Sequence, residues 1–254
     1  MTHVEKGPST TPENRLFSQQ RLLVFVPTFN DTELVASIVS EICAISSNLT
    51  VLVVDDGSTN PVDRTSLPDQ CLLFRTPDNF GLGTATHIAL DHMLKHGYDA
   101  LVRVDADGQH PIDRLTDILR TLETAEVDLV VGGRANRNEG TAPRDLSARL
   151  VRGYLSVVAR ILTKNRAPAD LNSGLFAVNA RAAAVLNQTP LERFPEPEMY
   201  ILACRRGLRV KEVSVEQGKR KHGESSVTIG HALRLLYRFN MFALSELIQG
   251  SKTQ

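Results

Sequence analysis

The chain has no net charge, no long apolar run and few cysteines, and each absence excludes a class of protein. It carries 29 basic and 29 acidic side chains, so a basic surface for nucleic acid is not indicated. No stretch approaches the ~18 apolar residues of a membrane span. Three cysteines, Cys43, Cys71 and Cys204, form no CxxC pair, which favours reduced thiols in a cytoplasmic protein.

The start of the chain also lacks the apolar stretch of a signal peptide. The first twenty residues are polar and contain Pro8 and Pro12. We therefore expect a disordered tail at residues 1–20, one domain over residues 21–226, and a C-terminal helix and tail over residues 227–254. A chain of 254 residues, 42% of them hydrophobic, is long enough to bury a large core.

Apolar runs of strand length alternate with amphipathic helical segments along the chain. Strands are expected at residues 21–26, 50–54, 72–74, 100–104, 128–131, 174–178 and 209–215. Helices are expected at residues 31–46, 84–96, 146–162, 181–186, 198–206 and 227–248, with one more after Pro111. This alternation predicts an α/β domain with a mainly parallel central sheet flanked by helices.

Polar residues follow four of the expected strands, where each strand ends. The four segments are Pro27–Asp31, Asp55–Thr59, Asp105–Asp107 and Gly132–Arg134. Each alone is compatible with ordinary turn chemistry. Because the carboxyl ends of parallel strands meet at one edge of a sheet, we expect the four to converge into a ligand site.

The segment Asp105-Ala106-Asp107 carries the most specific chemistry. Residues two apart on a strand point to the same side, so we expect the carboxylates of Asp105 and Asp107 to share one face. Hard oxygen ligands of this kind suit Mg²⁺ or Mn²⁺ bridging to a phosphate. The alternative is a pair of acids in a turn before a helix.

Other nucleotide and metal motifs fail on inspection. The segment Asn79–Thr84 is followed by Thr86 where a dinucleotide fingerprint needs Gly or Ala, and we expect its loop to place Asn79 beside a nucleotide cleft instead. His110 stands where an EF-hand needs Gly. The chain contains neither a P-loop nor a serine nucleophile elbow.

As an ordered set, the motifs resemble those of inverting family 2 glycosyltransferases of the GT-A fold. The matching segments are VPTFND, LVVDDGST, NFGLGTA, VDADGQH, GGR, DLNSG, EPEM and KRKHGES, between residues 22 and 226. The likeness is greatest to polyprenol-phosphate (dolichol-phosphate) mannosyl and glucosyl synthases. It implies transfer of a sugar, with inversion, from a nucleotide-sugar donor to a polyprenyl phosphate, with Mg²⁺ or Mn²⁺ as cofactor.

The resemblance also implies roles for individual residues. Contacts with the nucleotide sugar are implied for Pro27, Phe29, Asp31, Val54, Asp56, Asp105, Ala106, Asp107, Arg134 and Arg220. Asp107 and Gln109 would bind the metal together with Asp105, which makes Asp107 a catalytic residue. Arg134 and Arg220 would contact the donor phosphates, because a guanidinium group can bind two oxygens at once.

The acceptor decides whether a general base is needed. A lipid phosphate is already an oxyanion, whereas a hydroxyl must lose a proton to a carboxylate. Glu198 is the first candidate for that base and Asp170 the second. Glu198 could instead be an exposed acid in the first turn of a helix that follows Pro195 and Pro197.

The chain departs from the family pattern at several positions, and rival functions stay open. Phe29 and Asp31 replace the usual Tyr and Glu, Ser226 replaces a Lys, and Phe176 stands where relatives often have Arg. One rival keeps the donor and uses a hydroxyl of a small metabolite or saccharide as acceptor. Another is a non-catalytic nucleotide-sugar-binding protein, against which the intact set of metal ligands argues.

Two segments after the parallel strands are expected to move or to dock. The polar loop from Arg134 to Asp145 should close over a bound donor. The last helix has a broad apolar face, with Arg234 and Arg238 one turn apart. It could lie on an anionic membrane surface, but the width of the apolar face slightly favours packing against the core.

Overall fold

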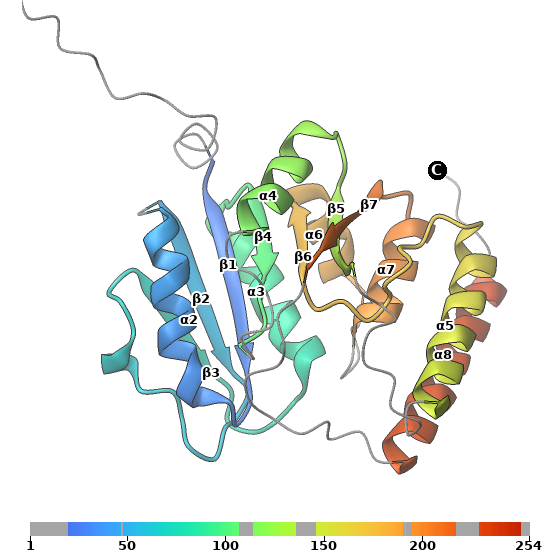
Figure 1. The fold of residues 1–254 in the computed structure, drawn as a ribbon, viewed down its shortest axis with the longest axis horizontal. Helices are drawn as coiled ribbons and strands as arrows, with labels where there is room; N and C mark the ends of the chain where they lie inside the picture. Colours follow the sequence, from blue (N-terminus) through green and yellow to red (C-terminus); the bar gives the residue numbers. More distant parts are fainter. Residues whose placement is uncertain are drawn as a thin grey trace, which may run out of the picture.

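The computed structural model describes residues 20–46, 48–106, 114–135, 146–189, 191, 195–216 and 229–249. Strands and helices alternate along the chain, as expected, and form one layered α/β domain (Figure 1). The strands are β1 (Leu22–Thr28), β2 (Leu49–Asp55), β3 (Cys71–Arg75), β4 (Ala100–Arg103), β5 (Leu129–Arg134), β6 (Phe176–Asn179) and β7 (Val210–Val215). The helices are α2 (Thr32–Ile45), α3 (Leu82–His96), α4 (Leu115–Thr124), α5 (Leu146–Thr163), α6 (Ala180–Asn187), α7 (Glu196–Arg205) and α8 (Ile229–Gln249), with a short 3₁₀ turn at Arg64–Ser66.

The seven strands form one sheet in the order β3-β2-β1-β4-β6-β5-β7. Only β6 runs antiparallel to its neighbours, and the other neighbouring pairs are parallel. Since β6 lies between β4 and β5, those two strands point the same way. The carboxyl ends of β1, β2, β4 and β5 therefore share one edge, and the expectation of a mainly parallel sheet is confirmed.

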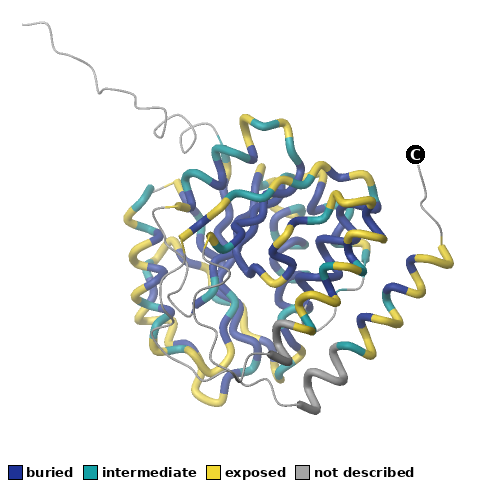
Figure 2. Tube along the Cα trace, turned by 45° about the vertical axis from the view of Figure 1, so that its right-hand side comes forward, coloured by how far each residue is buried: buried dark blue, intermediate teal, exposed yellow. Residues whose placement is uncertain are grey.

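Hydrophobic cores lie on both faces of this sheet. Along β1, Val24 belongs to one core and Phe25 to the other, as strand alternation requires. Helices α2 and α4 pack over the first core, while α3, α5, α6 and α7 cover the second. Figure 2 shows the buried residues gathered along the strands and on the inward sides of these helices.

Two strands continue two or three residues beyond their expected ends, and each extension has a physical cause. β1 continues through Pro27, because β4 pairs only with Leu22–Phe25 and no ladder bond is required of Pro27 on that side. β5 continues through Gly132 and Gly133 because it pairs with β7 along its whole length. β4 ends at Arg103, so Asp105 lies beyond the strand.

The C-terminal helix packs on the domain with one side only. Phe239 and Ala243 are buried in the second core, whereas Leu244 and Ile248 stay exposed. The last helix therefore packs against the core, as expected, but only with part of its apolar face. None of the helices in the described part of the chain is long and apolar enough to cross a membrane. The three cysteines form no disulfide.

Candidate active site at the carboxyl edge of the sheet

The loops after β1 and β2 are joined to each other by hydrogen bonds. The Asn30 backbone N–H donates to Ser58 Oγ at 2.9 Å, and the Thr59 N–H donates to Asn30 Oδ1 at 2.9 Å. On either side of Asn30 in the chain, Phe29 and Asp31 are exposed. Asp31 precedes α2, but its side chain makes no capping hydrogen bond. The carboxylate predicted to meet the nucleotide is thus not used to cap the helix.

The carboxylate of Asp56 holds the loop that contains Asn79. It accepts hydrogen bonds from the backbone N–H groups of Phe80 at 3.0 Å and Gly81 at 2.6 Å. Gly57 permits the close approach, because a Cβ there would lie 2.5 Å from the backbone of Asp78. The structure therefore brings Asn79 beside the end of β2, where the nucleotide cleft was expected.

The end of β4 carries a buried guanidinium group that the sequence analysis did not single out. Arg103 lies two residues before Asp105, and its Nε and Nη2 contact Asp105 Oδ1 at 2.8 and 2.6 Å. Its Nη1 contacts Glu196 Oε1, at the start of α7, at 2.7 Å. Although Asp105 lies beyond β4, these contacts show that its side chain and that of Arg103 point to the same side. Arg103 thereby ties Asp105 to α7.

The surroundings of Arg103 explain why it stays charged in the interior. Burial alone would lower its pKa, but the carboxylates of Asp105 and Glu196 raise it above its ordinary value. Its guanidinium also lies 5.9 Å from the ring of Phe176, its register partner on β6. The resemblance implied an Arg at the position of Phe176, and here the neighbouring strand supplies a guanidinium beside that position.

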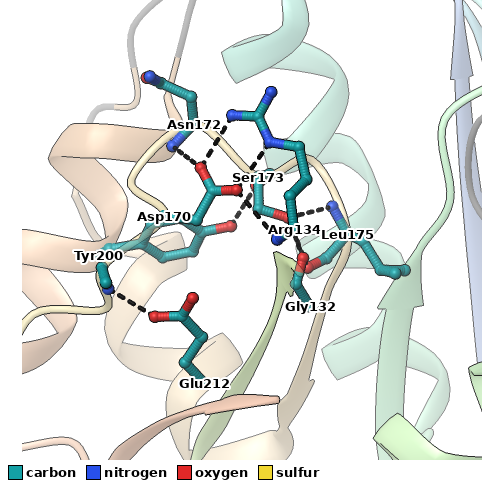
Figure 3. A network of polar contacts seen from close by, with 9 residues as sticks. Gly132, Arg134, Asp170, Asn172, Ser173, Leu175, Tyr200 and Glu212 are labelled. Atoms are coloured by element: carbon teal, nitrogen blue, oxygen red, sulfur yellow. Dashed lines mark hydrogen bonds and ion pairs between the residues drawn. The ribbon is translucent and has the colours of Figure 1, made fainter. Parts of the chain in front are cut away.

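A second ion pair joins β5 to the segment before β6, as Figure 3 shows. Arg134 Nε and Nη2 contact the two carboxylate oxygens of Asp170 at 2.8 and 3.0 Å. Burial alone would raise the pKa of Asp170, but the hydrogen bonds and charge of Arg134 hold it below its usual value. Arg134, the predicted phosphate ligand, therefore contacts Asp170 in this structure.

The segment between Asp170 and β6 is fixed by two hydroxyl groups (Figure 3). Ser173 Oγ donates to the Gly132 carbonyl at 2.5 Å, and the Tyr200 hydroxyl donates to the Ser173 carbonyl at 2.5 Å. A Cβ on Gly174 would lie 2.1 Å from Asp105 Oδ2. A side chain at position 174 would therefore require the Asp105 side chain or this segment to shift.

Glu198 lies in the first turn of α7, as predicted, but it is buried rather than exposed. Its residue is 8% exposed, and burial raises the pKa of its carboxyl group to about 7. Glu196, two positions earlier on the same helix, is instead paired with Arg103. A carboxyl group that titrates near neutral pH is suited to take up and release protons.

The predicted metal ligands are only partly within the described residues. Asp105 supplies a carboxylate at the expected edge, and both of its contacts from Arg103 fall on Oδ1. Asp107, Gln109 and Arg220 lie outside the described residues, as does the loop at residues 136–145. Within the described part no cluster of three acidic, histidine or cysteine side chains can hold a metal. An oxygen donor at Asp105 fits Mg²⁺ or Mn²⁺, and it would need the other two predicted ligands.

We call the set Arg103, Asp105, Arg134, Asp170 and Glu196 the strand-end site, while Asp56 lies after β2 and Glu198 lies in the first turn of α7. Its members come from β4 and the residues that follow it, from β5, from the segment before β6, and from α7. Pro27 and Val54 lie in β1 and β2, and Ala106 is buried next to Asp105. Arg103 and Glu196 were not predicted as site residues, because neither lies in one of the four polar segments that follow the expected strands.

The sheet order and its polar carboxyl edge are those of the GT-A fold. Solved structures of glucosyl-3-phosphoglycerate synthase from Mycobacterium tuberculosis share it. One of them, in complex with Mn²⁺, UDP and phosphoglyceric acid, has a TM-score of 0.68 and 16% identity, over 98% of this chain and 86% of that one. At this identity the likeness concerns the fold alone. The protein-family model described as glycosyl transferase family 2 matches residues 23–187 of the chain. The chain belongs to that family and is a glycosyltransferase.

Curated relatives include enzymes named for lipid-phosphate acceptors. The polyprenol monophosphomannose synthase of Mycolicibacterium smegmatis is 36% identical over 121 residues, which is 45% of each chain. The undecaprenyl-phosphate mannosyltransferase of Micrococcus luteus is 28% identical over 88% of this chain and 95% of its own. The chain thus matches less than half of the first relative and nearly all of the second. The resemblance to polyprenol-phosphate sugar transferases is confirmed.

Proposed function

We propose that the protein transfers a sugar from a nucleotide sugar to a polyprenyl phosphate, with inversion and with Mg²⁺ or Mn²⁺. The observation that carries the proposal is family membership combined with a near full-length relative named as an undecaprenyl-phosphate mannosyltransferase. The strand-end site supports it, because acids and guanidinium groups stand together where α/β sheets bind ligands. The sugar and the base stay open.

Donor binding is assigned to the loops after β1, β2 and β3. Phe29 and Asp31 are exposed there, and Asp56 holds the loop of Asn79 in place. Asp105, Asp107 and Gln109 would hold the divalent cation, which supplies positive charge to the departing nucleoside diphosphate. Arg134 and Arg220 would stabilise the same developing charge through their guanidinium groups.

A donor phosphate bound by Arg134 would share the guanidinium group with Asp170. The backbone N–H, Nε and Nη2 of Arg134 all contact the carboxylate of Asp170. Asp170 would then act as the group that orients Arg134 rather than as a base, because its lowered pKa makes it a weak proton acceptor. This ranking favours Glu198 as the base in any reaction that needs one.

Glu198→Gln tests the acceptor class, because it keeps the shape of the side chain and removes its basicity. A phosphate acceptor needs no base, so turnover at saturating acceptor should fall by less than about tenfold. A hydroxyl acceptor needs one, and the loss should reach about 10²–10⁴-fold. Turnover is measured with polyprenyl phosphate and, separately, with a panel of sugar and small hydroxyl acceptors.

The control for this experiment is donor binding. Calorimetry with nucleoside diphosphate and Mn²⁺ should give the same affinity for the wild type and Glu198→Gln. A loss of a hundredfold or more, with donor affinity unchanged, would refute the phosphate acceptor and support the hydroxyl rival. A wild-type protein that binds the donor but transfers sugar to neither class would support the non-catalytic alternative.

A further inference from the structure

Eight exposed apolar side chains share one spacing on α5 and α8. They are Leu150, Tyr154, Val157 and Ile161 on α5, and Tyr237, Met241, Leu244 and Ile248 on α8. In each helix the four residues stand at positions i, i+4, i+7 and i+11. This spacing places each set of four along one side of its helix. We call the two sets the apolar stripes.

The stripes run beside each other at matching heights. Tyr154 of α5 donates a hydrogen bond to Asn240 of α8. Nearer the C-termini of both helices, Arg205 contacts the Leu162 carbonyl of α5 and the Glu246 carboxylate of α8. The helices therefore run parallel, as Figure 1 shows. Each α8 stripe residue is 87 positions after its α5 counterpart, which agrees with these contacts.

Arg205 fastens the two helices to the body of the protein. Its Nε lies 2.5 Å from Glu246 Oε2, and its Nη1 lies 3.2 Å from the Leu162 carbonyl oxygen. Arg205 is the last residue of α7, and both it and Glu246 are buried. On the inner side of α8, Phe239 and Ala243 join the core. These contacts hold the helices that carry the stripes against the rest of the protein.

The exposed charges beside the stripes are all positive. From residue 150 to residue 166 the chain has four basic residues, Arg152, Arg160, Lys164 and Arg166, all exposed, and no acid. From residue 236 to residue 249 the charged residues are Arg238, which is exposed, and Glu246, which is buried against Arg205. These two segments therefore carry exposed cations and no exposed acid, although the chain as a whole has no net charge.

From this combination we infer that the α5–α8 face docks on an anionic phospholipid surface. Apolar side chains can enter the boundary between headgroups and acyl chains, while flanking Arg and Lys meet the negative headgroups. A second copy of the chain fits less well, because it would bring the same cations together. The inference deepens the proposed function, since a polyprenyl phosphate acceptor lies in such a surface.

Helix α7 connects this face to the strand-end site. It begins at Glu196, which contacts Arg103, and ends at Arg205, which contacts α5 and α8. Ten residues at 1.5 Å each span about 15 Å. A protein docked through α5 and α8 therefore holds the candidate site close to the lipid surface.

Vesicle flotation tests the docking surface with the full chain. The wild type should float with vesicles of phosphatidylcholine and phosphatidylglycerol, less with pure phosphatidylcholine, and less as salt is raised. Replacing Val157 and Leu244 together by Glu should weaken binding to the anionic vesicles at least about tenfold. Leu72→Glu is the matched control, because Leu72 is an exposed apolar residue on the edge strand β3. It should float like the wild type.

Several results would overturn the inference. One is a wild type that does not float, and another is a Val157→Glu/Leu244→Glu protein that floats equally well. A third is a wild-type dimer, seen by light scattering, that becomes a monomer in this double variant, because the stripes would then bind a second copy.

Transfer to a short, water-soluble polyprenyl phosphate separates docking from the proposed function. The double variant should keep this transfer and lose most transfer to a long-chain acceptor in vesicles. A protein that floats but transfers to neither acceptor would refute the proposed function and leave docking intact. Transfer to the short acceptor without flotation would refute docking alone.

Discussion

The strand-end site and the α5–α8 face depart in opposite ways from the usual arrangement of polar groups outside and apolar groups inside. At the end of β4, Arg103 and Glu196 are buried with their charges. On α5 and α8, side chains such as Ile161 and Ile248 are 69% and 77% exposed. Buried charges and exposed apolar side chains are both unfavourable, and the two regions differ in how this cost is offset.

Buried charges are tolerated at the strand-end site because they are paired within the chain. Arg103 contacts two carboxylates, and Asp170 is held by Arg134. Glu198 differs from these paired acids, because it is buried and its pKa is raised. In the same turn of α7, Glu196 is the acid that is paired with Arg103. The apolar stripes have no such compensation among the described residues. An exposed apolar patch of this kind is typical of an interaction site, in agreement with the docking surface inferred above.

Removal of the divalent cation should separate the two regions most strongly. With a chelator, or in Asp107→Asn, transfer should fall at least about a hundredfold, because the cation contributes several kcal/mol to the departing charge. Flotation with anionic vesicles should not change, since no predicted metal ligand lies on α5 or α8. The measurements are turnover, calorimetry with nucleoside diphosphate, and flotation. Unchanged metal-dependent binding in Asp107→Asn would refute its assignment as a ligand.

Loss of the central guanidinium should destabilise the protein by about 3–5 kcal/mol. Arg103→Met leaves Asp105 and Glu196 buried without their cation, and removal of one partner of a buried pair has this typical cost. The matched variant is Arg160→Met, because Arg160 is an exposed residue of α5. This change should alter the free energy of unfolding by less than about 0.5 kcal/mol. Denaturant titration of both variants makes the comparison.

A second variant shows whether Arg103 acts through its partners. Adding Glu196→Gln to Arg103→Met removes one of the two abandoned charges, so part of the lost stability should return. If Arg103→Met and Arg160→Met unfold at the same denaturant concentration, the buried ion pairs do not stabilise this region as the structure indicates.

The pH dependence of stability should reveal Glu198. Its folded pKa of about 7 lies above the ordinary 4.5, so between these values the folded protein binds more protons than the unfolded chain. The stabilisation is complete below pH 4.5 and is lost as the pH rises through 7, on the order of 3 kcal/mol. Glu198→Gln should be less sensitive over this range, as measured by denaturant titration at pH 5 and pH 8.

Asp170 should respond to pH in the opposite direction. Because its folded pKa is lowered, its contribution to the free energy of unfolding is present above its unfolded pKa and is lost on acidification.

For Glu198, identical pH profiles of the wild type and Glu198→Gln between pH 5 and 8 would contradict the burial of this residue.

The fold was more predictable from sequence than the site. Strand alternation and helical periodicity placed each element to within a few residues, because both depend on local apolar pattern. The convergence of four strand ends also followed, once a mainly parallel sheet was expected. Arg103 could not be found this way, because its partner Glu196 is 93 residues away. The antiparallel register that places Phe176 opposite Arg103 is likewise seen only in the structure.

Burial of acids was the other limit of sequence reasoning. Glu198 follows two prolines at the start of a helix, a pattern typical of an exposed first-turn acid. Whether such an acid is buried depends on what packs over α7, and that packing is tertiary. The width of the apolar face on the last helix was likewise visible in the sequence, but which part of it would stay exposed was not.

The smallest effect is expected from neutral polar substitutions in the stripes. Val157→Ser and Leu244→Ser remove exposed apolar groups that make little use of the core, so each should change the free energy of unfolding by less than about 0.5 kcal/mol. Val158→Ser is the matched control, because Val158 is the next residue on α5 and packs partly against the core. It should cost more than either stripe variant. If Val157→Ser proved as destabilising as Val158→Ser, the stripe would be part of the core in solution, and the contrast between the two regions would disappear.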